Sequence, residues 1–372
     1  NNRAIRGNAI RGSVVRKSAL GGALFVDSGT ASVMNSILWG NWGHLSGTSA
    51  QPRIMERSGL ITGSSNIIAS ASAPRYNVPI GTDPLFDSNL RLGAGSPAIE
   101  AGDNAANTQS KERDGNHRIA DDPMVAYSGT GTAPIIDLGA YEKVHRWYVD
   151  QSAPEPGDGL TWATAFPDLD SALAGASAGH EIWVAEGTYV PANTFEVTAN
   201  LRIYGGFPMS GGLFGSRDPA VHRTILCGDI DGDGDASWPD PDNADHVLRF
   251  APDLTGCVLD GFTIRRGNAD GAGDDGRGGG LVVGAGSSPL LESLFITANH
   301  ASEDGGGLFF EGTPDVRRVG FNANSCGNDG AAASGLNSLG FFADCFFDRN
   351  TAGRHGGGLA GEGCALAVRR ST

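Results

Sequence analysis

The sequence lacks the features that define several large classes of protein. No stretch of its 372 residues reaches the eighteen consecutive apolar side chains typical of a membrane-spanning helix. Lysine and arginine form no basic block, and the net charge of −15 disfavours binding to the phosphates of nucleic acids. Glycine shows no three-residue period, which excludes collagen. No G-x-S-x-G motif marks a nucleophile elbow, so that type of hydrolase has no support.

Cysteine is scarce and shows no metal-binding spacing. The five cysteines are Cys227, Cys257, Cys326, Cys345 and Cys364. An odd number cannot pair completely within one chain. No two have the C-x-x-C spacing of a zinc or redox site. We interpret them as isolated buried thiols, with a disulfide among them as the alternative.

Glycine is abundant, with 57 residues, and it recurs with a period of 25 to 27 residues. The clusters lie at 278–280, 305–307 and 356–358, with a degenerate copy at 330–332. A second signal keeps the same period, because an apolar residue followed by asparagine precedes each later cluster. These asparagines are Asn299, Asn324 and Asn350. Two signals in step indicate a repeat whose unit is one coil of short strands joined by turns.

Such coils predict an all-β fold, a right-handed parallel β-helix. A single coil cannot bury its own apolar face, whereas stacked coils pair each strand with those above and below. Glycine and asparagine tolerate the positive φ angles of tight turns. Asparagines at one position in successive coils can also form a hydrogen-bonded ladder. We therefore expect structural roles for the glycines and asparagines.

The pattern further predicts two tandem units, 1–142 and 143–372. Residues 83–142 do not repeat and are rich in turns, as expected of a terminal cap of the first unit. A new start follows, with a strand at 147–150. Asp168 can N-cap a short helix at about 168–177, with Leu169, Ala172, Leu173 and Ala176 on one apolar face. We expect this helix to cover the first coil of the second unit.

These segments resemble known surface proteins. Residues 147–189 are similar to the N-terminal cap of bacterial right-handed parallel β-helix repeat proteins. Residues 83–142 resemble their terminal module, which often precedes a choice-of-anchor region. The Gly-Gly-Gly-Leu and Phe-x-x-Asn repeats are similar to those of chlamydial polymorphic outer membrane proteins, although Ile296 replaces the phenylalanine before Asn299. The resemblance implies a secreted or cell-surface location and no single chemistry.

One acidic segment has the spacing of a calcium loop. Counted from Asp229, carboxylates occupy positions 1, 3 and 5, glycine position 6 and another carboxylate position 12. The candidate ligands are Asp229, Asp231, Asp233, Asp235 and Asp240. Aspartate at position 12 and the absence of flanking helices predict modest affinity. A solvated acidic insertion is the alternative. The acidic stretch at 270–275 has a looser spacing, and we interpret it as a solvated loop.

No catalytic constellation is visible. No motif places carboxylates on outward strand positions of neighbouring coils, and paired arginines such as Arg317 and Arg318 suggest solvated turn charges. We expect surface or turn positions for His180, His222, His246, His300 and His355.

The sequence therefore predicts a non-catalytic, monomeric secreted or cell-surface repeat protein, used for adhesion, carbohydrate contact or structural display. Its partners would be carbohydrate or a host or cell-surface molecule. The alternative is a polysaccharide lyase or glycoside hydrolase on the same scaffold. Because the chain starts without methionine and stops within a repeat, we expect a fragment of a longer protein.

Overall fold

The computed structural model describes part of the N-terminal region and most of the remainder. Before residue 83 it describes 24–26, 30–32, 34–38, 54–56, 60–62 and 66–68. From residue 83 it describes the chain except 87–89, 94, 110–117, 119–121, 123–124, 155–156, 235–239 and 241. The chain divides into two compact units, Asn1–His145 and Arg146–Thr372.

The first unit contains three pairs of short parallel strands. They are β1 (Leu24–Val26) with β4 (Ile54–Glu56), β2 (Thr30–Ser32) with β5 (Leu60–Thr62), and β3 (Ser36–Leu38) with β6 (Asn66–Ile68). Partners in every pair are 30 residues apart in sequence. The described part of 83–142 consists mainly of turns, with one 3-10 helix, η1 (Asn104–Ala106). Its Ala98, Ile99 and Leu138 pack against Ile37 of β3.

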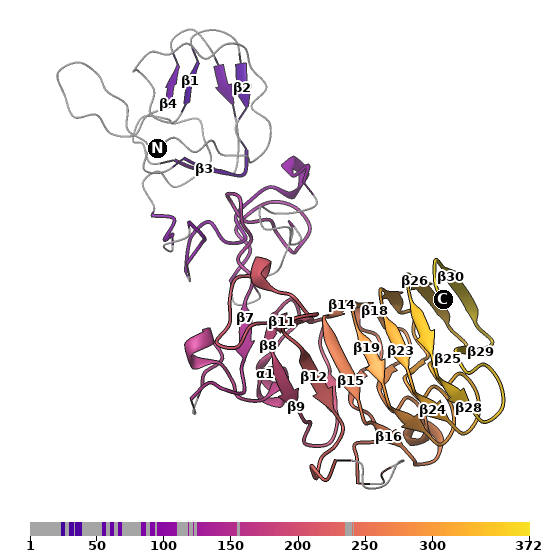
Figure 1. Ribbon diagram of the computed structural model, residues 1–372. Coiled ribbons are helices and arrows are strands. Elements are labelled where there is room, and N and C mark those ends of the chain that lie inside the picture. The colour runs from indigo at the N-terminus through magenta and orange to yellow at the C-terminus, as the bar shows by residue number, and fades with distance from the viewer. Residues whose placement is uncertain are drawn as a thin grey trace. The chain divides into compact units, whose positions relative to one another are not determined.

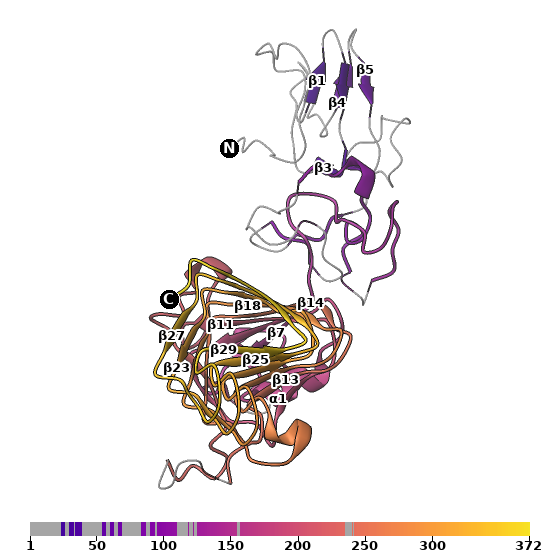
Figure 2. The same cartoon turned by 90° about the vertical axis from the view of Figure 1, so that its right-hand side faces the viewer.

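The second unit is a stack of parallel strands in four sheets (Figures 1 and 2). The eight-stranded sheet contains β7 (Arg146–Val149), β8 (Glu181–Ala185), β11 (Arg202–Phe207), β14 (Thr255–Asp260), β18 (Ser288–Glu292), β22 (Asp315–Arg317), β26 (Leu339–Ala343) and β30 (Ala365–Arg369). The β9–β27 sheet contains β9 (Gly187–Tyr189), β12 (Thr224–Cys227), β15 (Phe262–Arg265), β19 (Phe295–Thr297), β23 (Gly320–Asn322) and β27 (Phe346–Asp348).

Two further sheets complete each coil. The β10–β29 sheet contains β10 (Phe195–Val197), β13 (Leu248–Phe250), β17 (Leu281–Val283), β21 (Leu308–Phe310), β25 (Ala333–Leu336) and β29 (Leu359–Glu362). The four-stranded sheet contains β16 (Asn268–Ala269), β20 (His300–Ala301), β24 (Ser325–Cys326) and β28 (Thr351–Ala352). The remaining 3-10 helices are η2 (Trp162–Thr164), η3 (Phe214–Ser216) and η4 (Gly273–Gly276).

This arrangement is a parallel β-helix, as predicted. Figure 2 looks along the stack and shows successive coils lying over one another. Inward side chains form apolar columns, such as Ile264, Ile296 and Phe321, all 0% exposed. The rings of Phe321 and Phe347 stack 5.2 Å apart in the same column. The right-handed sense of winding stays a prediction.

The predicted helix is present as α1 (Leu169–Gly175). Asp168 is its N-cap, and its carboxylate accepts a hydrogen bond from the Ser171 N–H at 2.7 Å. Leu169, Ala172 and Leu173 are buried in the same core cluster as the first strands of the stack. Within the described residues this is the single α-helix, and it covers apolar side chains at the start of the second unit.

The asparagine ladder is also present. Asn324 Oδ1 accepts from the backbone N–H of Asn299 at 3.1 Å and from its Nδ2 at 3.0 Å. Asn324 Nδ2 donates to Asn350 Oδ1 at 3.0 Å and to the Ile296 carbonyl at 2.9 Å. Asn299 and Asn324 are fully buried. The ladder therefore provides hydrogen-bonding partners for polar groups that the turns bury between coils.

One expectation about these turns is wrong. The asparagines do not have positive φ; the residues before them do, with φ of 51° at Ala298, 51° at Ala323 and 53° at Arg349. The asparagine side chain is instead held by the ladder. In the glycine clusters the first glycine has the left-handed conformation, with φ of 66° at Gly305. A Cβ on Gly306 would lie 2.0 Å from the Ser325 carbonyl, so the clusters also allow close contact between coils.

All five cysteines are unpaired, and four of them are buried. Among the described residues, no helix combines the length and apolar character needed to cross a bilayer. The surface placement of His180 and His246 is wrong, because each is 3% exposed. His180 Nδ1 accepts a hydrogen bond from Trp147 Nε1 of β7 at 3.0 Å. The imidazole ring is therefore buried by a partner that is distant in sequence.

Candidate metal centre and outer sheet face

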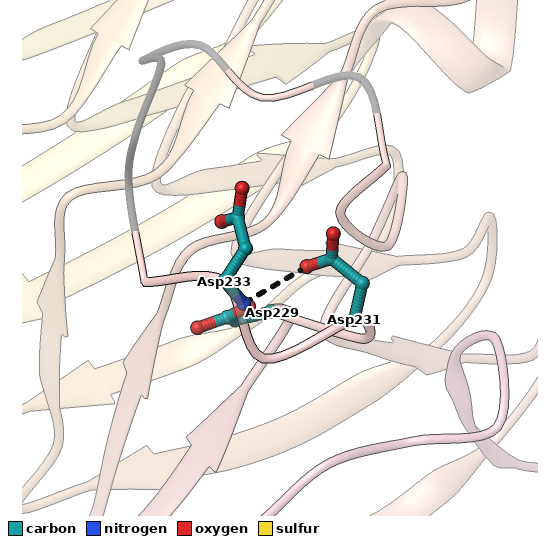
Figure 3. Close-up of side chains that lie close together, drawn as sticks. All are labelled: Asp229, Asp231 and Asp233. Carbon is teal, nitrogen blue, oxygen red and sulfur yellow. Dashed lines mark hydrogen bonds between the residues drawn. The ribbon is translucent and has the colours of Figure 1, made fainter.

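The acidic loop follows β12 and precedes β13, so strands flank it. Asp229, Asp231 and Asp233 each offer a carboxylate oxygen, and these atoms lie within 4.8 Å of one another (Figure 3). Asp231 and Asp233 are exposed, whereas Asp229 is partly buried. Short turns produce this convergence, because Asp229 Oδ1 accepts from Gly232 N at 2.9 Å and Asp231 Oδ1 from Asp233 N at 3.2 Å.

The other two candidate ligands do not join this trio among the described residues. Asp240 is 4% exposed, and its Oδ1 accepts from the Asp242 N–H at 3.2 Å in the turn before β13. Asp235 lies outside the described residues. The trio holds hard oxygen ligands of the kind that calcium prefers. Asp229, Asp231 and Asp233 are the residues that would hold the ion.

Arg266 is a feature of this loop that the sequence pattern does not show. Its Nη1 lies 2.5 Å from Asp229 Oδ2, and both side chains are less than one-fifth exposed. The arginine directly follows β15, in the coil after the loop. It therefore places a positive charge beside the carboxylates and competes with a cation for Asp229.

This competition leads to a prediction for calcium binding to the full chain. Arg266→Gln should raise the affinity for calcium, whereas Asp231→Asn with Asp233→Asn should lower it because two anionic ligands lose their charge. Gly234→Val should also lower the affinity, since Gly234 has φ of 79°. Isothermal titration calorimetry measures each affinity.

The matched control is Asp274→Asn with Asp275→Asn, which removes the same charge from the other acidic loop. That pair should leave the calcium affinity unchanged. An absence of heat for the unchanged chain at millimolar calcium, with an unchanged melting temperature, would leave 229–240 as a solvated acidic insertion.

The outer faces of the sheets carry ionic ladders between coils. Asp260 of β14 and Glu292 of β18 stand in register on neighbouring strands, so the expectation of no outward carboxylates in neighbouring coils is wrong. The sequence did not show this register, because the number of residues per coil changes along the stack. Each is paired with an arginine: Arg217 Nη1 lies 2.8 Å from Asp260, and Arg318 contacts Glu292. Arg318 is thus paired as well as exposed.

Two carboxylates in the turns between strands have lowered pKa values. Hydrogen bonding to Arg370 lowers the pKa of Asp344, and hydrogen bonding to Arg354 lowers the pKa of Asp329. Both groups remain ionised at neutral pH. A general acid of a glycosidase needs the opposite shift.

The β9–β27 sheet has an exposed aromatic strip on its outer face, defined as Phe295, Gly320 and Phe346. These residues are in register on β19, β23 and β27. The phenylalanines are 43% and 47% exposed. A Cβ on Gly320 would lie 2.9 Å from Phe295 Cδ2 and 3.9 Å from Phe346 Cδ1. Glycine thus lets the two rings approach from both sides.

A polar row runs beside this strip on the same strands. It consists of Thr297, Asn322 and Asp348, also in register. Asn322 Nδ2 donates to Asp348 Oδ2 at 3.0 Å, and Thr297 Oγ1 donates to Asn322 Oδ1 at 3.4 Å. The strip and the row together give one sheet face an apolar line and a parallel line of donors and acceptors. Alternation of side chains along each strand explains this arrangement.

Comparisons with known proteins define no family for the chain. No protein-family model matches it, and neither the curated proteins nor the solved structures contain a significant match. The fold alone defines the class of protein, which is a parallel β-helix.

Proposed function

We propose that this chain is a non-catalytic, secreted or cell-surface β-helix protein that contacts neutral carbohydrate through the outer face of its β9–β27 sheet. The aromatic strip beside the polar row is the observation that carries this proposal. Sugar rings present apolar C–H faces, which pack on aromatic rings, and hydroxyl edges, which bond to amide and carboxylate groups. Both lines run along the stack with one step per coil, about 4.8 Å. An extended polymer of sugar units has a comparable linear repeat.

The resemblance to bacterial surface repeat proteins supports the proposed location. Binding is favoured over cleavage at Asp260, Glu292, Asp329 and Asp344, because each of these four carboxylates is paired with an arginine. Calcium bound at 229–233 would act as an accessory that orders the loop.

Removing both rings of the strip tests the proposal. Phe295→Ala with Phe346→Ala should weaken binding of soluble neutral oligosaccharides by about 2 kcal/mol, roughly thirtyfold, at about 1 kcal/mol for each ring. Titration calorimetry with cello-, malto- and mannohexaose measures the loss.

Leu339→Ala is the matched control, because Leu339 is 57% exposed on β26 of another sheet. That variant should bind as the unchanged chain does. Equal affinity of the double phenylalanine variant would remove the strip from the binding surface.

A further inference from the structure

A groove of about 340 Å³ lies on the outer face of the β10–β29 sheet. Three outward side chains form its floor: Phe309 of β21, Ser334 of β25 and Ala360 of β29. They are in register on neighbouring strands. The outward side chain thus shrinks from a ring to a hydroxymethyl group and then to a methyl group. This decrease in size along the stack hollows the sheet face.

Polar residues that precede successive glycine clusters line one side of the groove. They are Arg277, Asp304, Asp329 and His355, accompanied by Arg354. Asp329 accepts from Arg354 Nη2 at 2.8 Å and from the backbone N–H of His355 at 2.8 Å. His355 Nδ1 lies 3.0 Å from the same carboxylate. The network fixes the direction of these groups before any ligand arrives.

The earlier coil continues the network. Asp304 Oδ1 accepts from the Asp329 N–H at 3.0 Å, and Arg277 Nε lies 3.6 Å from Asp304 Oδ2. The Arg277 guanidinium lies 5.4 Å from the centre of the Phe309 ring. Leu336 and Glu362 also line the groove. One small space therefore combines planar donors, planar acceptors and apolar surface.

We propose that this groove binds a neutral sugar unit. The lining contains two arginines, Arg277 and Arg354, and three carboxylates, Asp304, Asp329 and Glu362. Its positive and negative charges nearly cancel, so a charged ligand gains little net attraction. Paired guanidinium and carboxylate groups can donate to and accept from neighbouring hydroxyls of one ring. The volume is at the lower end of small-ligand pockets, about 300–1,000 Å³, which suits one or two sugar units.

This site rests on the proposed function and names a second contact for the same class of ligand. It lies on another sheet than the aromatic strip, so the two can be tested separately. The variant with Phe295→Ala and Phe346→Ala lacks the strip, and its residual binding reports the groove.

The test is saturation-transfer NMR of the full chain with cello-, malto- and mannotriose, and with digalacturonate as an acidic counter-probe. In the strip-less background, Ser334→Phe should lower the affinity for the neutral trisaccharides at least tenfold, because a ring fills the groove. Val282→Phe is the matched control: Val282 has the same register position two coils earlier and lies outside the groove. It should bind normally.

The outcomes separate the two proposals. No residual binding without the strip, or binding unaffected by Ser334→Phe, overturns the groove and leaves the strip standing. If Ser334→Phe lowers the binding of digalacturonate and leaves the binding of the neutral trisaccharides unchanged, the neutral ligand class is overturned. No binding by the unchanged chain overturns both proposals. If Ser334→Phe fails to fold, Arg354→Gln replaces it. Arg354 is 58% exposed, and an unchanged affinity of that variant would equally overturn the groove.

Discussion

Replacing Asn324 with leucine is expected to destabilise the second unit by about 2–6 kcal/mol. The change leaves at least two buried groups without their partner, the backbone N–H of Asn299 and the carbonyl of Ile296. Each unsatisfied buried group costs about 1–3 kcal/mol. Urea denaturation followed by circular dichroism measures the difference in the free energy of unfolding.

The control for this variant lies two residues earlier on the outer face. Asn322→Leu removes an amide that is partly buried and bonds to Asp348, so its cost should stay within about 1 kcal/mol. Equal destabilisation by the two variants would show that the inward ladder has no special role in holding successive coils together.

Replacing Glu181 with alanine should destabilise the start of the stack by about 3–5 kcal/mol. Its side chain is 0% exposed, and Oε2 accepts from Arg146 Nη2 at 2.7 Å and from Trp183 Nε1 at 3.0 Å. Arg146 in turn lies 3.8 Å from the centre of the Trp183 ring. Without the carboxylate, the cation is left largely buried without its partner. The melting temperature should fall by roughly 6–20 °C.

Glu292→Ala is the matched control for this cap interaction. It removes a carboxylate from the same sheet, but the partner Arg318 is 59% exposed, and surface ion pairs contribute about 0–1 kcal/mol. A melting temperature for Glu181→Ala that matches this control would mean that the Arg146–Glu181 pair does not hold β7 on β8.

The sequence contained most of the information about the stack. The glycine and asparagine spacings predict the coil, because a parallel β-helix repeats the same turn chemistry at each coil. The helix could be predicted from Asp168 and its apolar face, since capping and periodicity are local. The positive φ of Ala298 and Ala323 could not be predicted, because alanine has no preference for it. Their backbone N–H groups donate to carbonyls of the next coil, those of Asn322 at 3.1 Å and Asp348 at 3.0 Å, which are distant in sequence.

The candidate sites were only partly predictable. Local spacing brings Asp229, Asp231 and Asp233 together, but Arg266 reaches them through stacking across 37 residues. The groove residues share a visible signal, since Asp304, Asp329 and His355 each precede a glycine of the repeat. The groove itself could not be predicted. It forms because a small side chain, Ser334, follows a large one, Phe309, at the same outward position, and the sequence alone does not show which side chains of each strand face outward.

One proton NMR time course with neutral hexaoses tests the central claim most directly, because it reports binding and cleavage together. We expect saturation transfer from the chain to the sugar rings, weakened by Phe295→Ala with Phe346→Ala, and anomeric signals that stay constant over days. Absence of transfer would contradict carbohydrate contact, and new anomeric signals would contradict a non-catalytic scaffold.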